Sequence, residues 1–157
     1  MPGHKGRSFS GAMHELSRLD ITEIKGADSL FEADGIIAQS ERNMASLYGS
    51  AAAAYSAGGS TLCIQAMLAI MKQEGRTVYA VRNVHRAFLN AAALLGIEVD
   101  WIMPEYSGGI LSGRIGSETV RRAMSGSKNA ALYVTSPDYT GRIADIAALA
   151  EVCHDIG

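Results

Sequence analysis

The 157 residues include 14 basic and 16 acidic side chains, so the formal net charge at pH 7 is −2. A nearly neutral chain favours neither nucleic acid nor a membrane surface as a partner, and no run in it is long and apolar enough to span a bilayer. The length suits one ordinary domain core, and 48% of the residues are hydrophobic, as in a typical globular protein. Two cysteines and no charged-then-apolar leader at Met1 lead us to expect a reducing, cytoplasmic setting.

The first part of the chain predicts an arm and two helices. Residues 1–26 have weak hydrophobic periodicity and predict an extended arm. A helix is predicted over Ser40–Tyr48, with Gly49 as its stop, because glycine is favoured just after the last helical turn. A second helix is predicted over Thr61–Lys72 and ends near Gly75.

The second half alternates short β-rich runs with helical patterns. Strands are predicted at Thr77–Val81, Val99–Met103 and Ala130–Val134. Helices are predicted from a cap at Asn83 to a stop at Gly96, from Ser117 through Val120 and Met124, and over Ile143–His154. This alternation predicts an α/β fold with a mainly parallel sheet, helices on both faces, and ligands at the carboxyl ends of the strands.

The stretch Gly58-Gly59-Ser60-Thr61 precedes an amphipathic helical pattern. Glycines allow the backbone to approach a ligand closely, and the hydroxyls fall where a helix presents unpaired N–H groups. A phosphate can be held there by the helix N-terminus. The alternative is that Ser60 is only an N-cap, since serine is a usual cap.

Two later loops carry further candidates. His85 follows the strand Thr77–Val81, and we expect it in the first turn of a helix, where an imidazole can stack on a planar ring or exchange protons. The loop from Val134 to Gly141 is rich in hydroxyls and includes Ser136. Each loop has a simpler interpretation, a surface histidine beside a cap or a plain connection. Three loops after three expected strands would converge on one edge of the sheet, facing a shared cavity.

The motifs together resemble those of the Orn/Lys/Arg decarboxylase family, which are pyridoxal-phosphate enzymes of the aspartate-aminotransferase fold. The matching stretches occur in the family's order and span nearly the whole chain. They are Pro2-Gly3-His4-Lys5-Gly6, Asp20-Ile21-Thr22-Glu23, Gly59-Ser60-Thr61 with Gln65-Ala66-Met67, Arg82-Asn83-Val84-His85, and Thr135-Ser136-Pro137-Asp138-Tyr139-Thr140-Gly141.

The resemblance implies roles for particular residues. Gly59, Ser60 and Thr61 would hold the phosphate of pyridoxal 5'-phosphate. His85 would stack on the pyridine ring and is the catalytic candidate, and Ser136 would lie near the cofactor. Residues 1–26 would form an amino-terminal arm near the active site and the dimer interface, and residues 27–157 the front part of the cofactor-binding large domain.

The implied reaction is decarboxylation of a small-molecule substrate, the basic amino acid lysine, arginine or ornithine, by a homodimer or higher homo-oligomer in amino-acid or polyamine metabolism. In the family, an aspartate for the pyridinium nitrogen and a Schiff-base lysine come later than the position of Gly157. We therefore expect this chain to be an amino-terminal fragment that is inactive alone. Two alternatives stay open: an aminotransferase or acyltransferase-like enzyme of the same fold, and a non-catalytic module that binds a phosphorylated ligand.

Overall fold

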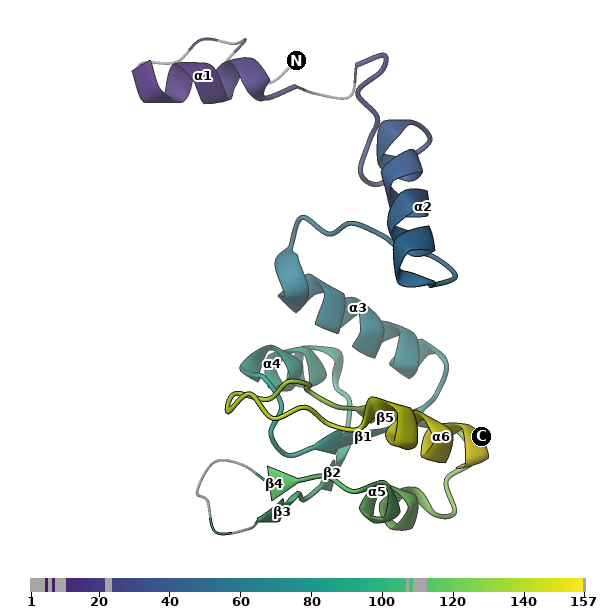
Figure 1. Ribbon diagram of the computed structural model, residues 1–157. Helices are drawn as coiled ribbons and strands as arrows, with labels where there is room; N and C mark the ends of the chain where they lie inside the picture. Colours follow the sequence, from purple (N-terminus) through teal and green to yellow (C-terminus); the bar gives the residue numbers. More distant parts are fainter. Residues whose placement is uncertain are drawn as a thin grey trace. The chain divides into compact units, whose positions relative to one another are not determined.

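The computed structural model describes residues 5, 7, 11–21, 24–106, 108 and 113–156. The chain divides into two compact units, Met1–Ala57 and Gly58–Gly157, whose elements are traced in Figure 1. Most of the Pro2–Gly6 motif and the pair Thr22-Glu23 lie outside the described residues.

The first unit contains helix α1 (Gly11–Leu19) and helix α2 (Ile36–Tyr48). The expectation of an extended arm over residues 1–26 is therefore wrong for the segment that forms α1. This segment includes methionine, glutamate, leucine and arginine, which are good helix formers. Met13 and Leu16 are spaced to share one helix face, although both are exposed. Helix α1 has only 9 residues, so its apolar side chains give little hydrophobic periodicity from which a helix could be predicted.

Helix α2 begins at Ile36 rather than at the expected Ser40 because a distant carboxylate caps it. The side chain of Asp28 accepts hydrogen bonds from the backbone N–H groups of Gly35 at 2.9 Å and Ile37 at 2.7 Å. A cap from outside the helix segment leaves no local motif in the sequence. The end of the helix is as predicted, since Gly49 follows Tyr48 with a φ of +63°.

The second unit is built on a three-stranded parallel sheet in the order β2-β1-β5. Strand β1 (Thr77–Val81) lies between β2 (Val99–Ile102) and β5 (Ala130–Tyr133). Val78 is aligned with Val99 on one side and with Ala131 on the other. The predicted parallel sheet is confirmed, and β1 has the predicted bounds.

Helices cover both faces of this sheet. Helices α3 (Gly59–Gln73) and α4 (Arg86–Leu95) pack on one face, in a cluster that contains Val78 and Ala80 of β1. Helices α5 (Ser117–Met124) and α6 (Ile146–Ile156) pack in a second cluster, which includes Tyr79. Successive side chains of a strand point to opposite faces, so β1 contributes to both clusters.

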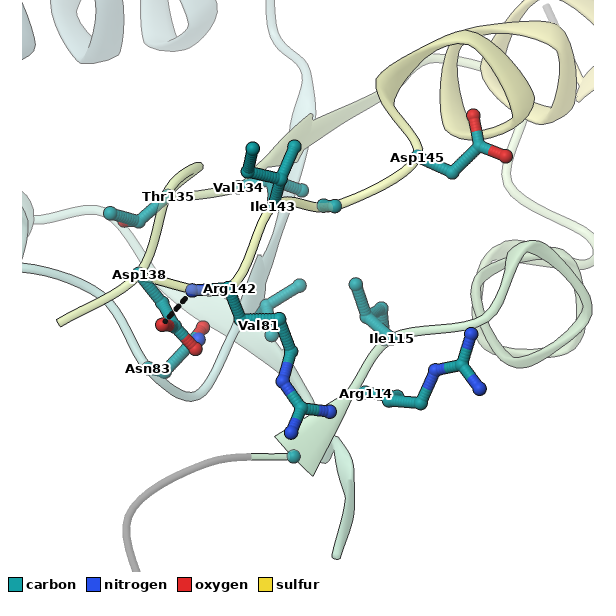
Figure 2. A pocket seen from close by; sticks show the side chains of 12 residues that line it. Val81, Asn83, Arg114, Ile115, Val134, Thr135, Asp138, Arg142, Ile143 and Asp145 are labelled. Atoms are coloured by element: carbon teal, nitrogen blue, oxygen red, sulfur yellow. Dashed lines mark hydrogen bonds between the residues drawn. The ribbon is translucent and has the colours of Figure 1, made fainter. Parts of the chain in front are cut away.

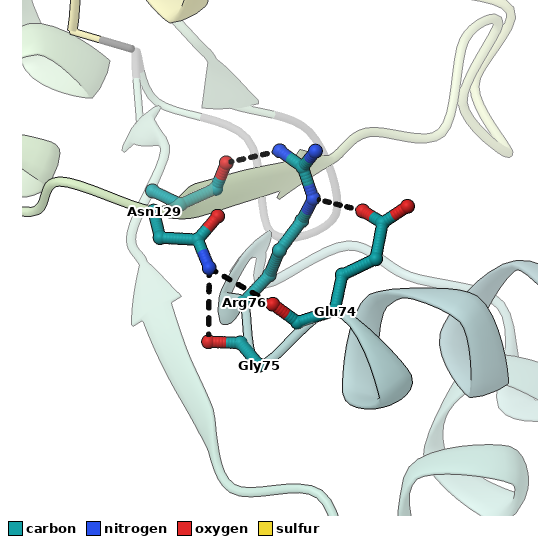
Figure 3. Close-up of polar contacts among 5 residues, drawn as sticks. Glu74, Gly75, Arg76 and Asn129 are labelled. Carbon is teal, nitrogen blue, oxygen red and sulfur yellow. Dashed lines mark hydrogen bonds and ion pairs between the residues drawn. The ribbon is translucent and has the colours of Figure 1, made fainter.

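The start of the sheet is held by a polar network, shown in Figure 3. The side-chain N–H groups of Asn129 donate to the carbonyl oxygens of Glu74 at 3.0 Å and Gly75 at 3.2 Å. The Arg76 guanidinium pairs with the Glu74 carboxylate and also donates to the carbonyl of Ala130. These contacts join the turn between α3 and β1 to the first residue of β5.

Several element ends differ from the expectations. Helix α3 begins at Gly59 instead of Thr61, and α6 begins at Ile146 instead of Ile143. The Asp145 carboxylate accepts the N–H of Ala148 at 3.1 Å, which places the helix start after it. Strands β2 and β5 each end one residue early. A short antiparallel pair, β3 (Glu105–Tyr106) and β4 (Gly113–Arg114), was not predicted.

Within the described residues no helix has the length and apolar character needed to cross a bilayer. The same part of the chain holds no group of three or more metal-ligating side chains.

Candidate functional site

The start of helix α3 is open to solvent. Gly58 occupies the N-cap position, and as a glycine it has no side chain that could cap this end of the helix. Ser60 is thus a residue of the first turn and not the cap. Gly59 has a φ of +64°, and a Cβ on it would meet nothing within 4 Å. Ser60 and Thr61 are exposed, so the first amides and hydroxyls of α3 are available to an anion.

Gly58 is a glycine for a different reason. A Cβ on this residue would lie 2.6 Å from the Cβ of Leu62. Any side chain here would push against the first turn of α3, so the close approach between Gly58 and Leu62 fixes the path by which the chain enters the helix.

His85, and not the expected Asn83, caps helix α4. Its Nδ1 accepts a hydrogen bond from the N–H of Ala87 at 3.0 Å. His85 therefore lies at the N-cap rather than in the first helical turn. A ring nitrogen that accepts a hydrogen bond carries no proton, so the proton of the neutral ring is on Nε2. The exposed ring is held in one orientation by this contact.

The loop after β5 is held by its own hydrogen bonds. The Ser136 hydroxyl oxygen accepts the N–H of Ala144 at 3.1 Å. The Asp138 carboxylate accepts from the hydroxyl of Thr140 at 2.7 Å and from the N–H of Arg142 at 3.0 Å. Ser136 thus has a structural contact, and the loop is ordered by serine and aspartate side chains.

These loops meet at one edge of the sheet. His85 follows β1 and Ser136 follows β5, and the two strands are parallel neighbours. The rings of His85 and Tyr139 are stacked, with centroids 6.1 Å apart and planes 15° from parallel. Contact between these rings ties the loop after β1 to the loop after β5.

The first turn of α3 is directed to the same edge. The helix ends only a short turn before β1 and packs on its face through Ile64 and Leu68. It therefore runs opposite to β1, as Figure 1 shows. The first of the three loops nevertheless does not follow a strand, because residues 51–57 form none. That part of the expectation is wrong.

A cavity of about 340 Å³ opens beside this edge. It is lined by the ends of β1 and β5, by β4, and by the segment leading to α6. Its polar and charged lining residues are Asn83, Arg114, Thr135, Asp138, Arg142 and Asp145, shown in Figure 2. None of Gly59, Ser60, Thr61, His85 or Ser136 lines this cavity. This cavity is therefore not the shared cavity that His85, Ser60 and Ser136 were expected to face.

The sequence contains only a partial signal for these lining residues. Asn83 and Asp138 belong to the stretches that resemble the family, but the sequence analysis assigned neither residue a ligand-binding role. Arg114 lies on the unpredicted strand β4. The pKa of Asp138 is lowered, first by the Thr140 hydroxyl and then by the N–H of Arg142, so this carboxylate is ionised at neutral pH.

The comparison with protein families agrees with the motifs. The family described as Orn/Lys/Arg decarboxylase, major domain, matches residues 2–157. The chain is 28% identical over 164 residues to the uncharacterized protein YaaO of Bacillus subtilis (strain 168), covering 100% of this chain and 34% of that protein. It thus spans about a third of that relative's length. The chain also aligns with the crystal structure of mouse CSAD, at 14% identity and a TM-score of 0.41. The alignment covers 96% of this chain and 43% of the CSAD chain.

Proposed function

Since this chain belongs to the Orn/Lys/Arg decarboxylase family, we propose that it contributes the phosphate-binding and ring-stacking residues of a pyridoxal-phosphate-dependent decarboxylase. The proposed substrate is a basic amino acid, lysine, arginine or ornithine. The observation that carries the proposal is the meeting of the His85 loop, the Ser136 loop and the first turn of α3 at one edge of the sheet.

The start of α3 fits a phosphate group. Its positive dipole end begins after a glycine at the N-cap, and the open space beside Gly59 leaves room for close approach. Ser60 and Thr61 would donate from backbone N–H groups and hydroxyls to the phosphate oxygens. When bound, pyridoxal phosphate supplies the electron sink that stabilises the carbanion left by decarboxylation.

His85 fits the stacking role because its ring is exposed and oriented. The N–H of Ala87 occupies Nδ1, so the imidazole faces and Nε2–H are what the ring can offer to a ligand. A flat ring lying against one imidazole face would be about 3.5–4 Å away, the usual separation of carbons in contact. Ser136 would act mainly through the loop shape that its bond to Ala144 maintains.

We also propose that the protein acts as a cytoplasmic homodimer or higher homo-oligomer. The unit Met1–Ala57 supports this, because among its described residues only Ala45 is a buried hydrophobic side chain. Large apolar side chains stay exposed there, including Leu19, Phe31 and Leu47. Such side chains are stabilised when another protein surface covers them.

The experiment compares cofactor binding by the wild-type protein and by Ser60→Ala, with Ser46→Ala on α2 as the matched control. Loss of a hydrogen bond to a charged phosphate should weaken binding by about tenfold or more, as seen in a visible-absorbance titration with pyridoxal phosphate. Release of carbon dioxide from lysine, arginine or ornithine by the full-length protein then tests the reaction. Equal affinity of wild type and Ser60→Ala would contradict the phosphate site.

A further inference from the structure

His85 and Tyr139 form a ring pair between the loop after β1 and the loop after β5. Their ring centroids are 6.1 Å apart and their planes are 15° from parallel. In the part of the chain that the structure describes, the His85 ring has no other ring contact. Tyr139 is nevertheless 77% exposed, so burial does not hold its ring there. The place of the ring has to come from the backbone of its loop.

A tight turn fixes the backbone of Tyr139. The N–H of Gly141 donates to the carbonyl of Asp138 at 2.9 Å, which closes a four-residue turn with Tyr139 at its second position. The Asp138 carboxylate holds the same turn, because it accepts the N–H of Thr140 at 2.9 Å and the Thr140 hydroxyl at 2.7 Å. None of these bonds uses the Tyr139 side chain. The turn therefore presents that side chain at a defined place and leaves its ring for His85.

The hydrogen bond at Nδ1 does not orient the imidazole by itself. The N–H of Ala87 reaches Nδ1 at 3.0 Å and so fixes the position of one ring atom. The ring plane can still tilt about that atom, since the χ2 torsion of histidine has broad minima. Near-parallel contact with Tyr139 is the second restraint. An offset aromatic pair favours one arrangement by about two- to tenfold in population.

We propose that Tyr139 is a positioning residue, which holds the His85 ring so that the imidazole face turned away from Tyr139 receives the ring of the cofactor. The inference rests on the proposed function, because it needs His85 to stack on pyridoxal phosphate. Tyr139 itself does not touch the cofactor and acts only through the imidazole. The loop after β5 thus sets the orientation of a ring that belongs to the loop after β1.

The test combines NMR of the His85 ring with a visible-absorbance titration of pyridoxal phosphate. Tyr139→Leu removes the aromatic ring, Tyr139→Phe keeps it, and Tyr48→Leu is the control because Tyr48 is 75% exposed. Without cofactor, only Tyr139→Leu should move the ring-proton resonances of His85, since a neighbouring aromatic ring displaces them. With cofactor, Tyr139→Leu should weaken binding by about two- to tenfold, whereas Tyr139→Phe and the control should bind as the wild type does.

A double-mutant cycle with His85→Asn shows whether Tyr139 acts through His85. In the His85→Asn background, Tyr139→Leu should weaken cofactor binding no further, because the ring that it positions is absent. An equal loss in both backgrounds overturns the proposal, and so does a Tyr139→Leu variant with wild-type affinity while His85→Asn binds weakly; the proposed function then stands. If His85→Asn itself binds as the wild type does, the stacking role in the proposed function fails. The NMR spectra then decide for Tyr139, and unchanged His85 resonances in Tyr139→Leu overturn its positioning role.

Discussion

The rings of His85 and Tyr139 lie nearly parallel, 6.1 Å apart between centroids, although they belong to loops after different strands. Their separation exceeds that of rings in full face contact, so the pair is offset and part of the imidazole face stays uncovered. His85 is in turn oriented by the N–H of Ala87. One side chain therefore caps a helix and also presents a ring at the edge of the sheet.

Substitutions at His85 should separate these two functions. His85→Asn retains a side-chain oxygen for the N–H of Ala87 but removes the ring, whereas His85→Ala removes both. Loss of a cap costs about 1 kcal/mol of unfolding free energy, so only the alanine variant should show this loss in urea unfolding. Both variants should lower cofactor affinity, and in the full-length protein also turnover, if the ring stacks on the cofactor. Unchanged kinetics for His85→Asn would exclude the stacking role.

The core between the sheet and helices α3 and α4 depends on Phe88. Its side chain is fully buried. The centroid of its ring lies 4.3 Å from the ring centroid of Tyr133 and 6.1 Å from that of Trp101. Phe88→Ala should cost about 3–5 kcal/mol of unfolding free energy, because it removes a large side chain and leaves a cavity. The neighbouring Leu89 is 44% exposed, so Leu89→Ala is the control. A similar cost for both variants in urea unfolding would contradict this packing.

The capping of α2 by Asp28 should make that helix sensitive to acid. Burial alone would raise the pKa of Asp28, but backbone N–H donors from Asp34, Ser29, Ile37 and Ala38 together hold it well below the ordinary value of 3.8. A carboxyl whose pKa is lower in the folded state stabilises it fully above the ordinary pKa. That contribution is lost as the pH falls through the lower folded value.

Carboxyl-carbon NMR titration of Asp28, with amide exchange at Ile37, measures this directly. We expect Asp28→Asn to increase exchange at Ile37 at neutral pH, while Asp34→Asn, whose side chain makes none of these contacts, leaves it unchanged. An Asp28 carboxyl that titrates at or above 3.8 would contradict the capping geometry.

The parallel sheet could be predicted because its strands and helices alternate with clear signals. Thr77–Val81 is a short β-rich run. Helix ends at Gly49 and Gly96 were predictable because glycine is favoured in the left-handed conformation that both residues adopt. The caps from Asp28 and His85 could not be read from local patterns. Asp28 acts across a loop, and histidine is an uncommon cap beside a better candidate, Asn83.

The same contrast holds at the candidate site. The Gly59-Ser60-Thr61 turn and the loops at His85 and Ser136 could be named from sequence, since each is a compact motif. The cavity could not, because it joins Arg114 of β4 to Asp138 and Arg142, residues whose proximity follows from the tertiary fold. The bond between Ser136 and Ala144 is equally a property of the folded loop.

The 157-residue chain by itself should release no carbon dioxide from lysine, arginine or ornithine. Pyridoxal-phosphate chemistry requires a lysine amine at the cofactor. In the second unit, Lys72 lies near the end of α3 and donates to the carbonyl of Leu95, and Lys128 precedes β5. Both are at the edge of the sheet where the strands begin, opposite to His85 and Ser136. Lys5 and Lys25 fall in the segment that the resemblance assigns to the amino-terminal arm, and not in the family's Schiff-base motif. Borohydride reduction after incubation with pyridoxal phosphate, followed by peptide mapping, should show only scattered labelling of exposed lysines. Stoichiometric labelling of a single lysine together with carbon dioxide release would show that this chain contains the complete reaction site.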